Sequence, residues 1–529
     1  MLAGDNYCAR IPKSPNFTFL IDISWSSSQN HVAYYALSAV KDFLLSRSSE
    51  DPEISFSLIL YDQHLHLVKF DTQSEDPCPS LLTLNPTTLE PTYNFSLNDF
   101  TNFLSDFNPD KLTQQFDILI EDLPQTCVSH TADWAMLKSI INHVSLSIRS
   151  YGGKICLVHG SESTYLPKLK KDPTKRGYFK NNDSDMHKIS NELHRSMGYM
   201  DLFLFGRGCN KNISSLGEMT RLAGGDIFLY KNAGESDLVN FYNDLVHSCS
   251  KTQTWETVFR MRNSSGWQKH GYGNFFISNF SDLLKIEGVD ENYSMFYKFS
   301  PDPKRPPNQT SNLFFVQTSL LFTDSRKRRL LRINNYAVPM AIQSPEIYLG
   351  MDYQAATCGL VKESLIQMCS AKPLTDIQIE LISKFKSILK QMCIGTDQEF
   401  QADQMAFMGL AFLGVYKHLV FRAQHYTDYK NPIVDRINYL KVSLNKMNVD
   451  SLFKQFNPLL FELSEQFLKQ SSPEEFEYPP MLELSWESVA GKPLVVMDDG
   501  LNIFLVFDSA TNALCQSIFR FSFFSNNFQ

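Results

Sequence analysis

The sequence lacks a long hydrophobic run and a leader segment. Its longest uncharged apolar stretch, Met405 to Tyr416, has 12 residues, whereas a helix that crosses a bilayer needs roughly 20. We therefore expect this stretch to form a buried helix. The first 13 residues include Asp5, Arg10 and Lys13 and no apolar segment, so no secretory signal is predicted and the cytosol is the expected compartment.

Cysteine pairs and enzyme signatures are also missing. The ten cysteines include no C-x-x-C spacing, which predicts neither a zinc ribbon nor a disulfide framework. No G-x-x-x-x-G-K-S/T, G-x-S-x-G or H-E-x-x-H motif occurs, so nucleotide hydrolysis, serine hydrolysis and zinc proteolysis have no local support. Gly206-Arg207-Gly208 lacks the third glycine of a dinucleotide loop, because Lys211 holds that place. An ordinary loop is the better interpretation.

An excess of positive charge is absent as well. The 529 residues include 49 Lys and Arg against 57 Asp and Glu, a net charge of −8. Bulk binding to nucleic acid requires an excess of Lys and Arg, so we expect no nucleic-acid partner, and any recognised anion must contact a local basic patch. The composition, 43% hydrophobic and 20% charged, is that of globular domains, and the length predicts about three or four of them.

Residues 14–250 alternate between apolar strands and helices. The expected strands are Asn16–Ile23, Ile54–Tyr61, Lys154–His159, Met200–Phe205 and Asp226–Tyr230. The expected helices are His31–Ser46, Leu97–Phe107, Ala132–Ile148, Met186–Met197, Ile213–Leu222 and Asp237–His247. This alternation is typical of a doubly wound, mostly parallel sheet. We predict one α/β domain over residues 14–250, preceded by a short segment, residues 1–13.

The pattern changes after residue 250. Consecutive β-rich runs without helices predict a β-sandwich over residues 251–345. Residues 346–470 have helical periodicity, broken at Pro373, Pro432 and Pro458, which predicts a helical domain. Residues 471–529 contain two strand-like runs around an Asp-Asp-Gly turn. The predicted fold is therefore a multidomain chain with α/β, all-β and all-α parts.

A candidate Mg²⁺ site lies at the end of the first strand. Asp22, Ser24 and Ser26 match D-x-S-x-S, the spacing by which von Willebrand A domains bind Mg²⁺ through oxygen ligands. Thr131 could supply a further hydroxyl. An acidic residue is expected after the strand Lys154–His159, but His159 and Gly160 stand there. The alternative is that Asp22 and Ser24 cap a turn.

Arg260 and Arg262 are the strongest candidates for anion binding. Residues two apart on a strand share a face, so both guanidinium groups project from one side while Phe259 and Met261 project into a core. Two such groups about 7 Å apart suit carboxylates, which guanidinium binds bidentately. The alternatives are a solvated strand face and an internal salt bridge.

A second basic cluster, Arg326-Lys327-Arg328-Arg329, is interpreted as a solvated hairpin turn. A contact with an anionic membrane is the alternative.

Eight strings stand out by their order and spacing along the chain. They are FLIDIS (19–24), GGKICLVHG (152–160), MDLFLFG (200–206), LAGGDIFLY (222–230), VFRMRNSSG (258–266), GYGNFFISNFSDLL (271–284), FVQTSLLFT (315–323) and RKRRLLRI (326–333). Together they resemble a known family, the cargo-binding adaptor subunit of the COPII vesicle coat. The resemblance covers about 320 residues of the trunk and sandwich and is weaker over FNPLLFEL and WESVAGKPLVVMDDGLNIFLVF.

The resemblance implies a von Willebrand A-like trunk, a β-sandwich, a helical domain and a partial gelsolin-like domain. It places Arg260 and Arg262 on the family's site for acidic export signals, with Leu321 on a neighbouring strand as an apolar contact. No cofactor is expected, since the four-cysteine zinc ribbon that precedes the family's trunk has no counterpart here, and the gelsolin-like part is short.

The function implied is that of a cargo adaptor in transport from the endoplasmic reticulum to the Golgi, without catalysis. The implied partners are the sister coat subunit, cargo tails with acidic signals, the coat small GTPase and an acidic membrane surface on the cytosolic side of the endoplasmic reticulum. The expected membrane patch is Lys168, Lys170, Lys171, Lys175 and Arg176. Two alternatives are the GTPase-activating sister subunit and a metal-dependent von Willebrand A-type binding module.

Overall fold

The computed structural model divides the chain into two compact units. The first comprises residues 1–342, 362–377 and 423–446, and the second comprises residues 343–361, 378–422 and 447–529. The described residues are 1–8, 11–13, 16–48, 53–85, 97–126, 134–160, 184–206, 213–277, 282–307, 312–341, 350–370, 372–393, 402–422, 433–463, 479–492 and 494–507.

The trunk of the first unit is built on a mixed sheet, whose described strands run in the order β4-β3-β2-β1-β6-β7-β8, with β5 paired to β2. They are β1 (Asn16–Asp22), β2 (Ser55–Tyr61), β3 (Leu65–Lys69), β4 (Ser80–Leu84), β5 (Asn102–Phe103), β6 (Gly153–His159), β7 (Gly198–Phe205) and β8 (Ile227–Tyr230). β1, β2, β6, β7 and β8 pair in parallel. This confirms the predicted α/β fold. The antiparallel edge formed by β3 and β4 was not predicted.

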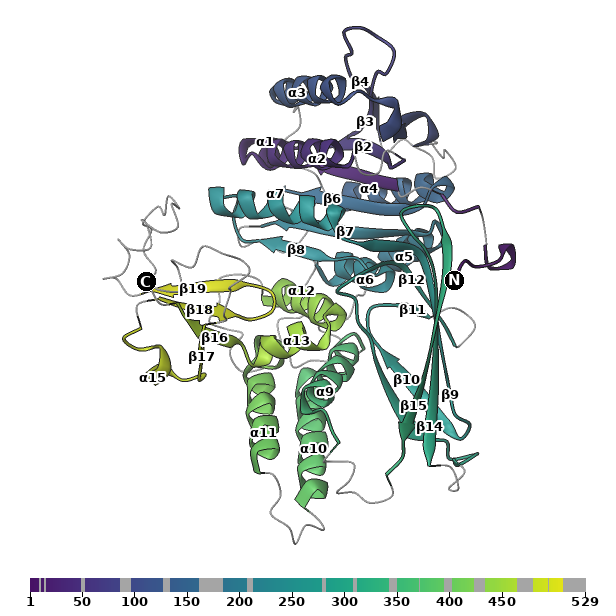
Figure 1. Cartoon of the computed structure of the whole chain (residues 1–529). Helices are drawn as coiled ribbons and strands as arrows, with labels where there is room; N and C mark the ends of the chain where they lie inside the picture. Colours follow the sequence, from purple (N-terminus) through teal and green to yellow (C-terminus); the bar gives the residue numbers. More distant parts are fainter. Residues whose placement is uncertain are drawn as a thin grey trace. The chain divides into compact units, whose positions relative to one another are not determined.

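Helices cover both faces of this sheet (Figure 1). They are α1 (Trp25–Gln29), α2 (Val32–Ser48), α3 (Pro109–Thr126), α4 (Trp134–Ser147), α5 (Ser184–Arg195), α6 (Ile213–Ala223) and α7 (Glu235–Ser250). α2 contacts α3 and α7, whereas α5 contacts α4 and α6. The connections from β1 to β2 and from β6 to β7 run in opposite directions along the sheet, so right-handed crossovers place the two groups on opposite faces.

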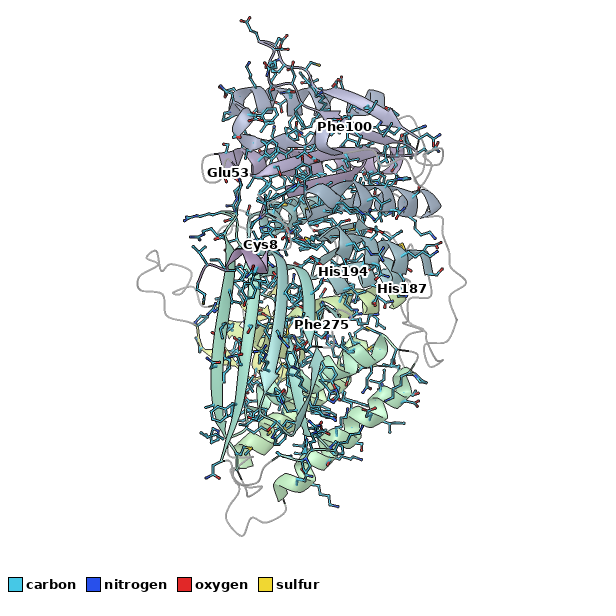
Figure 2. The ribbon with its side chains drawn as sticks, turned by 90° about the vertical axis from the view of Figure 1, so that its right-hand side faces the viewer. Cys8, Glu53, Phe100, His187, His194 and Phe275 are labelled. Atoms are coloured by element: carbon cyan, nitrogen blue, oxygen red, sulfur yellow. The ribbon has the colours of Figure 1, made fainter. Side chains whose placement is uncertain are left out.

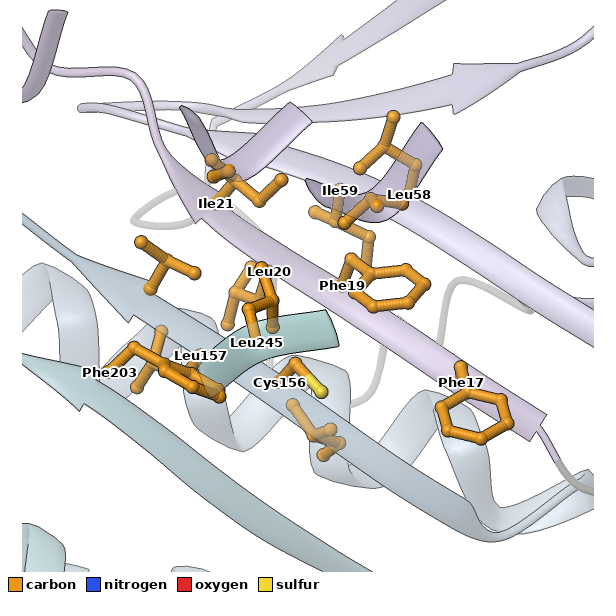
Figure 3. Close-up of a cluster of buried hydrophobic side chains, with 14 of the residues drawn as sticks. Phe17, Phe19, Leu20, Ile21, Leu58, Ile59, Cys156, Leu157, Phe203 and Leu245 are labelled. Atoms are coloured by element: carbon orange, nitrogen blue, oxygen red, sulfur yellow. The ribbon is translucent and has the colours of Figure 1, made fainter. Parts of the chain in front are cut away.

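The trunk core lies between these helices and the parallel strands. Burial on both faces explains the near-continuous apolar sequence of β1, β6 and β7, whose residues are all buried. Figure 3 shows Phe19 of β1 beside Cys156 of β6, its partner in the sheet, within this core.

The prediction of a helix over Leu97–Phe107 was wrong. The segment forms two 3₁₀ turns, Leu97–Phe100 and Leu104–Asp106, around the short strand β5. β5 pairs with Ser55 and Phe56 at the start of β2, where β3, which pairs only with residues 58–61, does not reach. Residues 102–103 therefore pair with the free edge at the start of β2, and this tertiary contact overrides the local preference for a helix.

The first unit continues into the predicted β-sandwich. Its strands are β9 (Gln253–Asn263), β10 (Trp267–Tyr272), β11 (Phe276–Ile277), β12 (Leu283–Asp290), β13 (Phe296–Pro301), β14 (Leu313–Thr323) and β15 (Arg329–Pro339). One sheet has the order β11-β12-β9-β14-β15, and β10 pairs with β13 in the other. Phe275, Leu284 and Ile286 form the core between them, and Figure 2 shows Phe275 among these strands.

The N-terminal segment packs on the sandwich. Leu2 forms a β-bridge with Leu330 of β15, and the Ala3 amide donates to the Arg329 carbonyl at 2.8 Å. A 3₁₀ turn, Asp5–Tyr7, follows, and Figure 2 shows Cys8 near the ends of the long strands. The first residues thus extend the β15 edge.

The helical stretch contributes to both units. It contains α9 (Tyr353–Met368), α10 (Leu374–Cys393), α11 (Ala402–Lys417), α12 (Ile433–Lys446) and α13 (Val449–Phe456). α12 contacts α6 and β8 in the first unit. Leu459–Glu462, expected in the helical domain, instead forms β16. The second unit's sheet has the order β17-β16-β18-β19, with β17 (Met481–Leu482), β18 (Leu494–Asp498) and β19 (Ile503–Phe507).

The run Met405–Tyr416 does form a helix, α11, but the helix is not fully buried. Met408 and Val415 are buried, whereas Leu410 is 61% exposed and Phe407 53% exposed. Uniformly apolar sequence gives no amphipathic signal, so the exposed face was not predicted. None of the helices in the described ranges is long and apolar enough to span a bilayer.

Candidate functional site

Strand β9 places Arg260 and Arg262 on the outer face of the larger sandwich sheet. β9 lies between β12 and β14, with Arg260 opposite Leu283 and Ser319, and Arg262 opposite Gln317. Phe259, on the other face, packs against the sandwich core with its ring 6.1 Å from that of Tyr297. The two guanidinium groups therefore project from the same side, away from the core.

The two arginines differ in their partners. The Nε of Arg260 donates to Asp282 Oδ2 at 2.6 Å, and its Nη2 contacts the same oxygen. Arg262 is exposed, and within the described residues its side chain has no hydrogen bond or ion pair. An internal salt bridge, one of the alternatives considered from the sequence, therefore forms at Arg260, and none is present at Arg262 among the residues that the structure describes.

Lys269 on β10 adds a third cation to this cluster. Its ammonium donates to the Met261 carbonyl. Met261 directly follows Arg260, the last β9 residue that pairs with β12. Burial, together with the charges of Arg260 and Arg262, lowers the pKa of Lys269 despite the opposing effect of Asp282. The cluster of Arg260, Arg262, Lys269 and Asp282 thus carries three positive charges and one negative charge.

Leu321 shares the outer face with the arginines. It lies on β14 opposite Val258 of β9 and Leu331 of β15, and it is half-buried. Because Leu321 lies opposite Val258, it is a diagonal neighbour of Arg260. Such diagonal neighbours on adjacent strands are roughly 7–8 Å apart. The sheet therefore brings the three residues singled out from the sequence onto one surface.

The basic run at 326–329 is only partly a solvated turn. Arg328 pairs with Asp324 at 2.7 Å and Lys327 with Glu53 at 2.9 Å, both at the surface. Arg329 is buried, and its Nη1 donates to the Glu256 carbonyl at 2.8 Å. The prediction of a solvated turn was therefore wrong for Arg329, which is the first residue of β15.

Asp22 lies fully buried where the strand order reverses, at the carboxyl ends of β1 and β6. Its Oδ1 accepts the Ser24 amide at 2.9 Å, and its Oδ2 accepts the Gly160 amide at 3.0 Å. His159 Nδ1 lies 3.4 Å from Oδ2 and 3.0 Å from the Tyr61 hydroxyl. Burial opposes ionisation, but His159 and the Ser24 amide outweigh it and lower the pKa of Asp22 to about 2.

These residues fit a Mg²⁺ ion poorly. Both carboxylate oxygens of Asp22 already accept N–H donors, and its neighbour His159 offers an imidazole nitrogen, whereas Mg²⁺ prefers oxygen ligands. Ser24 is buried and Ser26 partly exposed on α1, while Thr131 lies outside the described residues. No group of three or more His, Cys, Asp or Glu in the described ranges could hold a metal.

Two other candidates fall partly or wholly outside the described residues. The basic residues Lys168, Lys170, Lys171, Lys175 and Arg176 all lie there, as do Arg207 and Gly208. The role of the first group stays a prediction.

Comparison with known families decides the relationship. The Sec23/Sec24 trunk domain model matches residues 12–249, and the Sec23/Sec24 β-sandwich domain model matches residues 254–341. The chain belongs to the Sec23/Sec24 family. These two models meet at the boundary between α7 and β9, so the family relationship includes the strand that carries Arg260 and Arg262.

Curated relatives carry the name Sec24. Human protein transport protein Sec24C is 23% identical over 99% of this chain and 48% of its own length. Protein transport protein SEC24 of Dictyostelium discoideum is 23% identical over 76% of this chain and 40% of its own. The chain thus spans about half the length of these relatives. The crystal structure of the human COPII-coat protein Sec24c has a TM-score of 0.82 at 20% identity, over 98% of this chain and 67% of that one, which shows the shared fold.

Sequence reasoning missed Asp282 and Lys269 as members of the arginine cluster. Asp282 comes next to β9 only when β12 pairs with that strand, and Lys269 reaches the Met261 carbonyl from β10, a strand of the other sheet. The single usable signal was Asp282 directly before the apolar run of β12, but its register against β9 could not be read from the sequence.

Proposed function

We propose that this chain is a cargo adaptor of the COPII coat that recognises acidic export signals on the tails of cargo proteins. Its membership of the Sec23/Sec24 family and the Sec24 names of its curated relatives support this role. The observation that carries the binding site is the exposed guanidinium of Arg262, which has no ion pair among the described residues, beside Arg260 on the outer face of β9. The role is binding, without catalysis.

The chemistry of this face suits a short acidic peptide. Each guanidinium offers two parallel N–H donors to a carboxylate, in hydrogen bonds strengthened by charge. Leu321 supplies an apolar contact beside the arginines, so a signal with an acidic pair and an adjacent apolar side chain would use both features.

The proposed partners follow from the same role. We propose pairing of the trunk with the sister coat subunit, contact with the coat small GTPase and an acidic membrane, and a location on the cytosolic side of the endoplasmic reticulum and on coated vesicles. Co-elution with the sister subunit at matched concentration is the expected result. Stimulation of GTP hydrolysis by this chain alone, or Mg²⁺-dependent thermal stabilisation, would instead favour the two alternative roles.

The binding site is tested with a fluorescent peptide that contains two acidic residues. Truncation of both arginines in Arg260→Ala/Arg262→Ala removes the charge-assisted contacts, which contribute on the order of 1.5–3 kcal/mol, so affinity should fall by roughly one to two decades. Lys188→Ala/Arg195→Ala is the matched control, because it removes the same charge from exposed positions on α5. Equal loss in the two variants, or no loss in either, would refute the site.

A further inference from the structure

The arginine cluster contains its own carboxylate. Asp282 precedes β12, and its Oδ2 receives both the Nε and the Nη2 of Arg260. This is one of the guanidinium edges with which arginine binds a carboxylate ligand. An acidic peptide that approaches this face therefore finds one edge of Arg260 already occupied, whereas Arg262 has no carboxylate partner in the part of the chain that the structure describes.

We propose that Asp282 is an internal competitor that occupies Arg260 until an acidic ligand displaces it. This inference rests on the proposed function, because it concerns the same two arginines. Asp282 thereby sets how acidic a ligand must be. A single carboxylate can bind Arg262 alone, whereas a ligand with two carboxylates can bind Arg262 and also exchange with Asp282 at Arg260.

The exposure of the pair makes this exchange feasible. The side chains of Arg260 and Asp282 are 39% and 35% exposed, so solvent can replace either partner during exchange. Exposed ion pairs of this kind favour the closed arrangement by a factor of only about 1.4 to 5. A buried pair would resist displacement, because separating it would leave an uncompensated charge.

The neighbouring cations explain why the charge of Asp282 affects the binding of an acidic ligand. The charges of Asp282, Arg260 and Arg262 all act on Lys269, and Asp282, which pairs with Arg260, reduces the charge of the cluster from three to two. Its removal would free Arg260 and raise the positive potential that attracts an anionic peptide. Both effects strengthen binding of an acidic ligand.

The test measures binding of the two-carboxylate peptide to the full chain with Asp282→Asn, which keeps the shape and removes the charge. At low salt we expect the variant to bind about two- to fivefold more tightly than the wild type, with a smaller gain at high salt. Asp282→Ala serves as a second variant if the amide forms a new hydrogen bond. Thermal unfolding verifies that each variant is folded.

Two comparisons separate a local exchange from a general charge effect. Glu291→Gln removes one exposed charge just beyond the far end of β12, about 30 Å along the strand from Asp282, which exceeds the Debye length of about 10 Å. It should leave affinity unchanged. In an Arg260→Ala background, Asp282→Asn should lose most of its effect, since there is no Arg260 left to release.

The outcomes distinguish this inference from the proposed function. If Arg260→Ala/Arg262→Ala binds the peptide as well as the wild type, the site itself is wrong. If that variant loses binding but both Asp282 variants bind no more tightly than the wild type, Asp282 is not a competitor and instead holds Arg260 in a binding orientation. An equal gain from Glu291→Gln would also overturn the proposal.

Discussion

Lys154 and Asp201 form an ion pair inside the trunk. Lys154 Nζ lies 2.6 Å from Asp201 Oδ2, and neither side chain is exposed to solvent by more than 1%. The same ammonium donates to the carbonyl and hydroxyl oxygens of Ser248, both at 2.7 Å. These contacts join β6, β7 and α7, so the burial of the lysine depends on all three elements.

Lys154→Met should destabilise the chain strongly, because it leaves the Asp201 charge buried without its partner. Removal of one member of such a pair costs about 3–5 kcal/mol, which urea unfolding of the full chain would measure. Lys188→Met is the matched control, since its pair with Asp185 is 78% and 60% exposed and should contribute less than about 1 kcal/mol. Similar losses in the two variants would contradict the prediction.

Asp22 predicts a specific loss of stability in acid. The folded pKa of about 2 lies below the ordinary value of 3.8, so the group stabilises the fold above about pH 4, and this contribution is lost as the pH falls toward 2. The difference between the folded and ordinary pKa values corresponds to about 2–3 kcal/mol of stability. The stability difference between the wild type and Asp22→Asn should therefore shrink between pH 5 and pH 3 in urea titrations. Asp99→Asn, at an exposed position, is the control, and a constant difference for Asp22→Asn would refute the assignment.

At the scale of elements, α11 contains two glycines in different surroundings. A Cβ added at Gly414 would lie 2.0 Å from the Phe456 carbonyl oxygen, whereas one added at Gly409 would meet nothing within 4 Å. Gly414→Ala should force α11 away from the end of α13 and cost about 1–3 kcal/mol. Gly409→Ala should stabilise the helix by about 0.5–1 kcal/mol. Thermal unfolding of both variants checks the prediction, which fails if the two shifts have the same sign.

The elements that the sequence predicted well are those with an unambiguous period. β1, β6 and β7 are uninterrupted apolar runs buried on both faces, and each agrees with its prediction to within two residues. The helix prediction for Leu97–Phe107 was wrong because the conformation of this segment depends on pairing with the start of β2, about 45 residues earlier in the chain.

In the candidate site too, the local features could be predicted and the long-range contacts could not. The shared face of Arg260 and Arg262 follows from the two-residue period of any strand, so it could be predicted. Asp282 could not, because its contact with Arg260 depends on the register between β9 and β12. Local periodicity thus indicated which side chains share a face. Long-range strand pairing decided which of these arginines has its charge paired with a carboxylate of the chain.

At the scale of the whole molecule, buried charges join the parts of the first unit. Lys446 at the end of α12 lies 2.7 Å from both Asp226 of the trunk and Asp290 of the sandwich, and Lys251 contacts the same two carboxylates. Burial would raise the pKa of Asp226, but the two lysines more than offset it and lower the pKa. A helix far along the chain therefore supplies a counter-charge to the trunk and the sandwich together.

The net charge of −8 requires that any attachment to an acidic membrane come from a local basic surface. At the 326–329 run, Lys327 and Arg328 already pair with Glu53 and Asp324, and Arg329 is buried, so this surface offers little net positive charge. The residues Lys168, Lys170, Lys171, Lys175 and Arg176 have one acidic residue, Asp172, among them. This second group remains the predicted membrane patch.

Replacement of all five patch residues by Ala should weaken binding to phosphatidylserine vesicles, because each Lys or Arg near an anionic surface contributes about 1 kcal/mol. Vesicle sedimentation at low salt would measure the loss, which should diminish as salt screens the interaction. Arg326→Ala/Lys327→Ala/Arg328→Ala is the control that tests the other basic run, and it should bind nearly as well as the wild type, since two of its three charges are already paired within the chain. A larger loss in this control than in the five-residue variant would move the membrane contact to the β14–β15 turn.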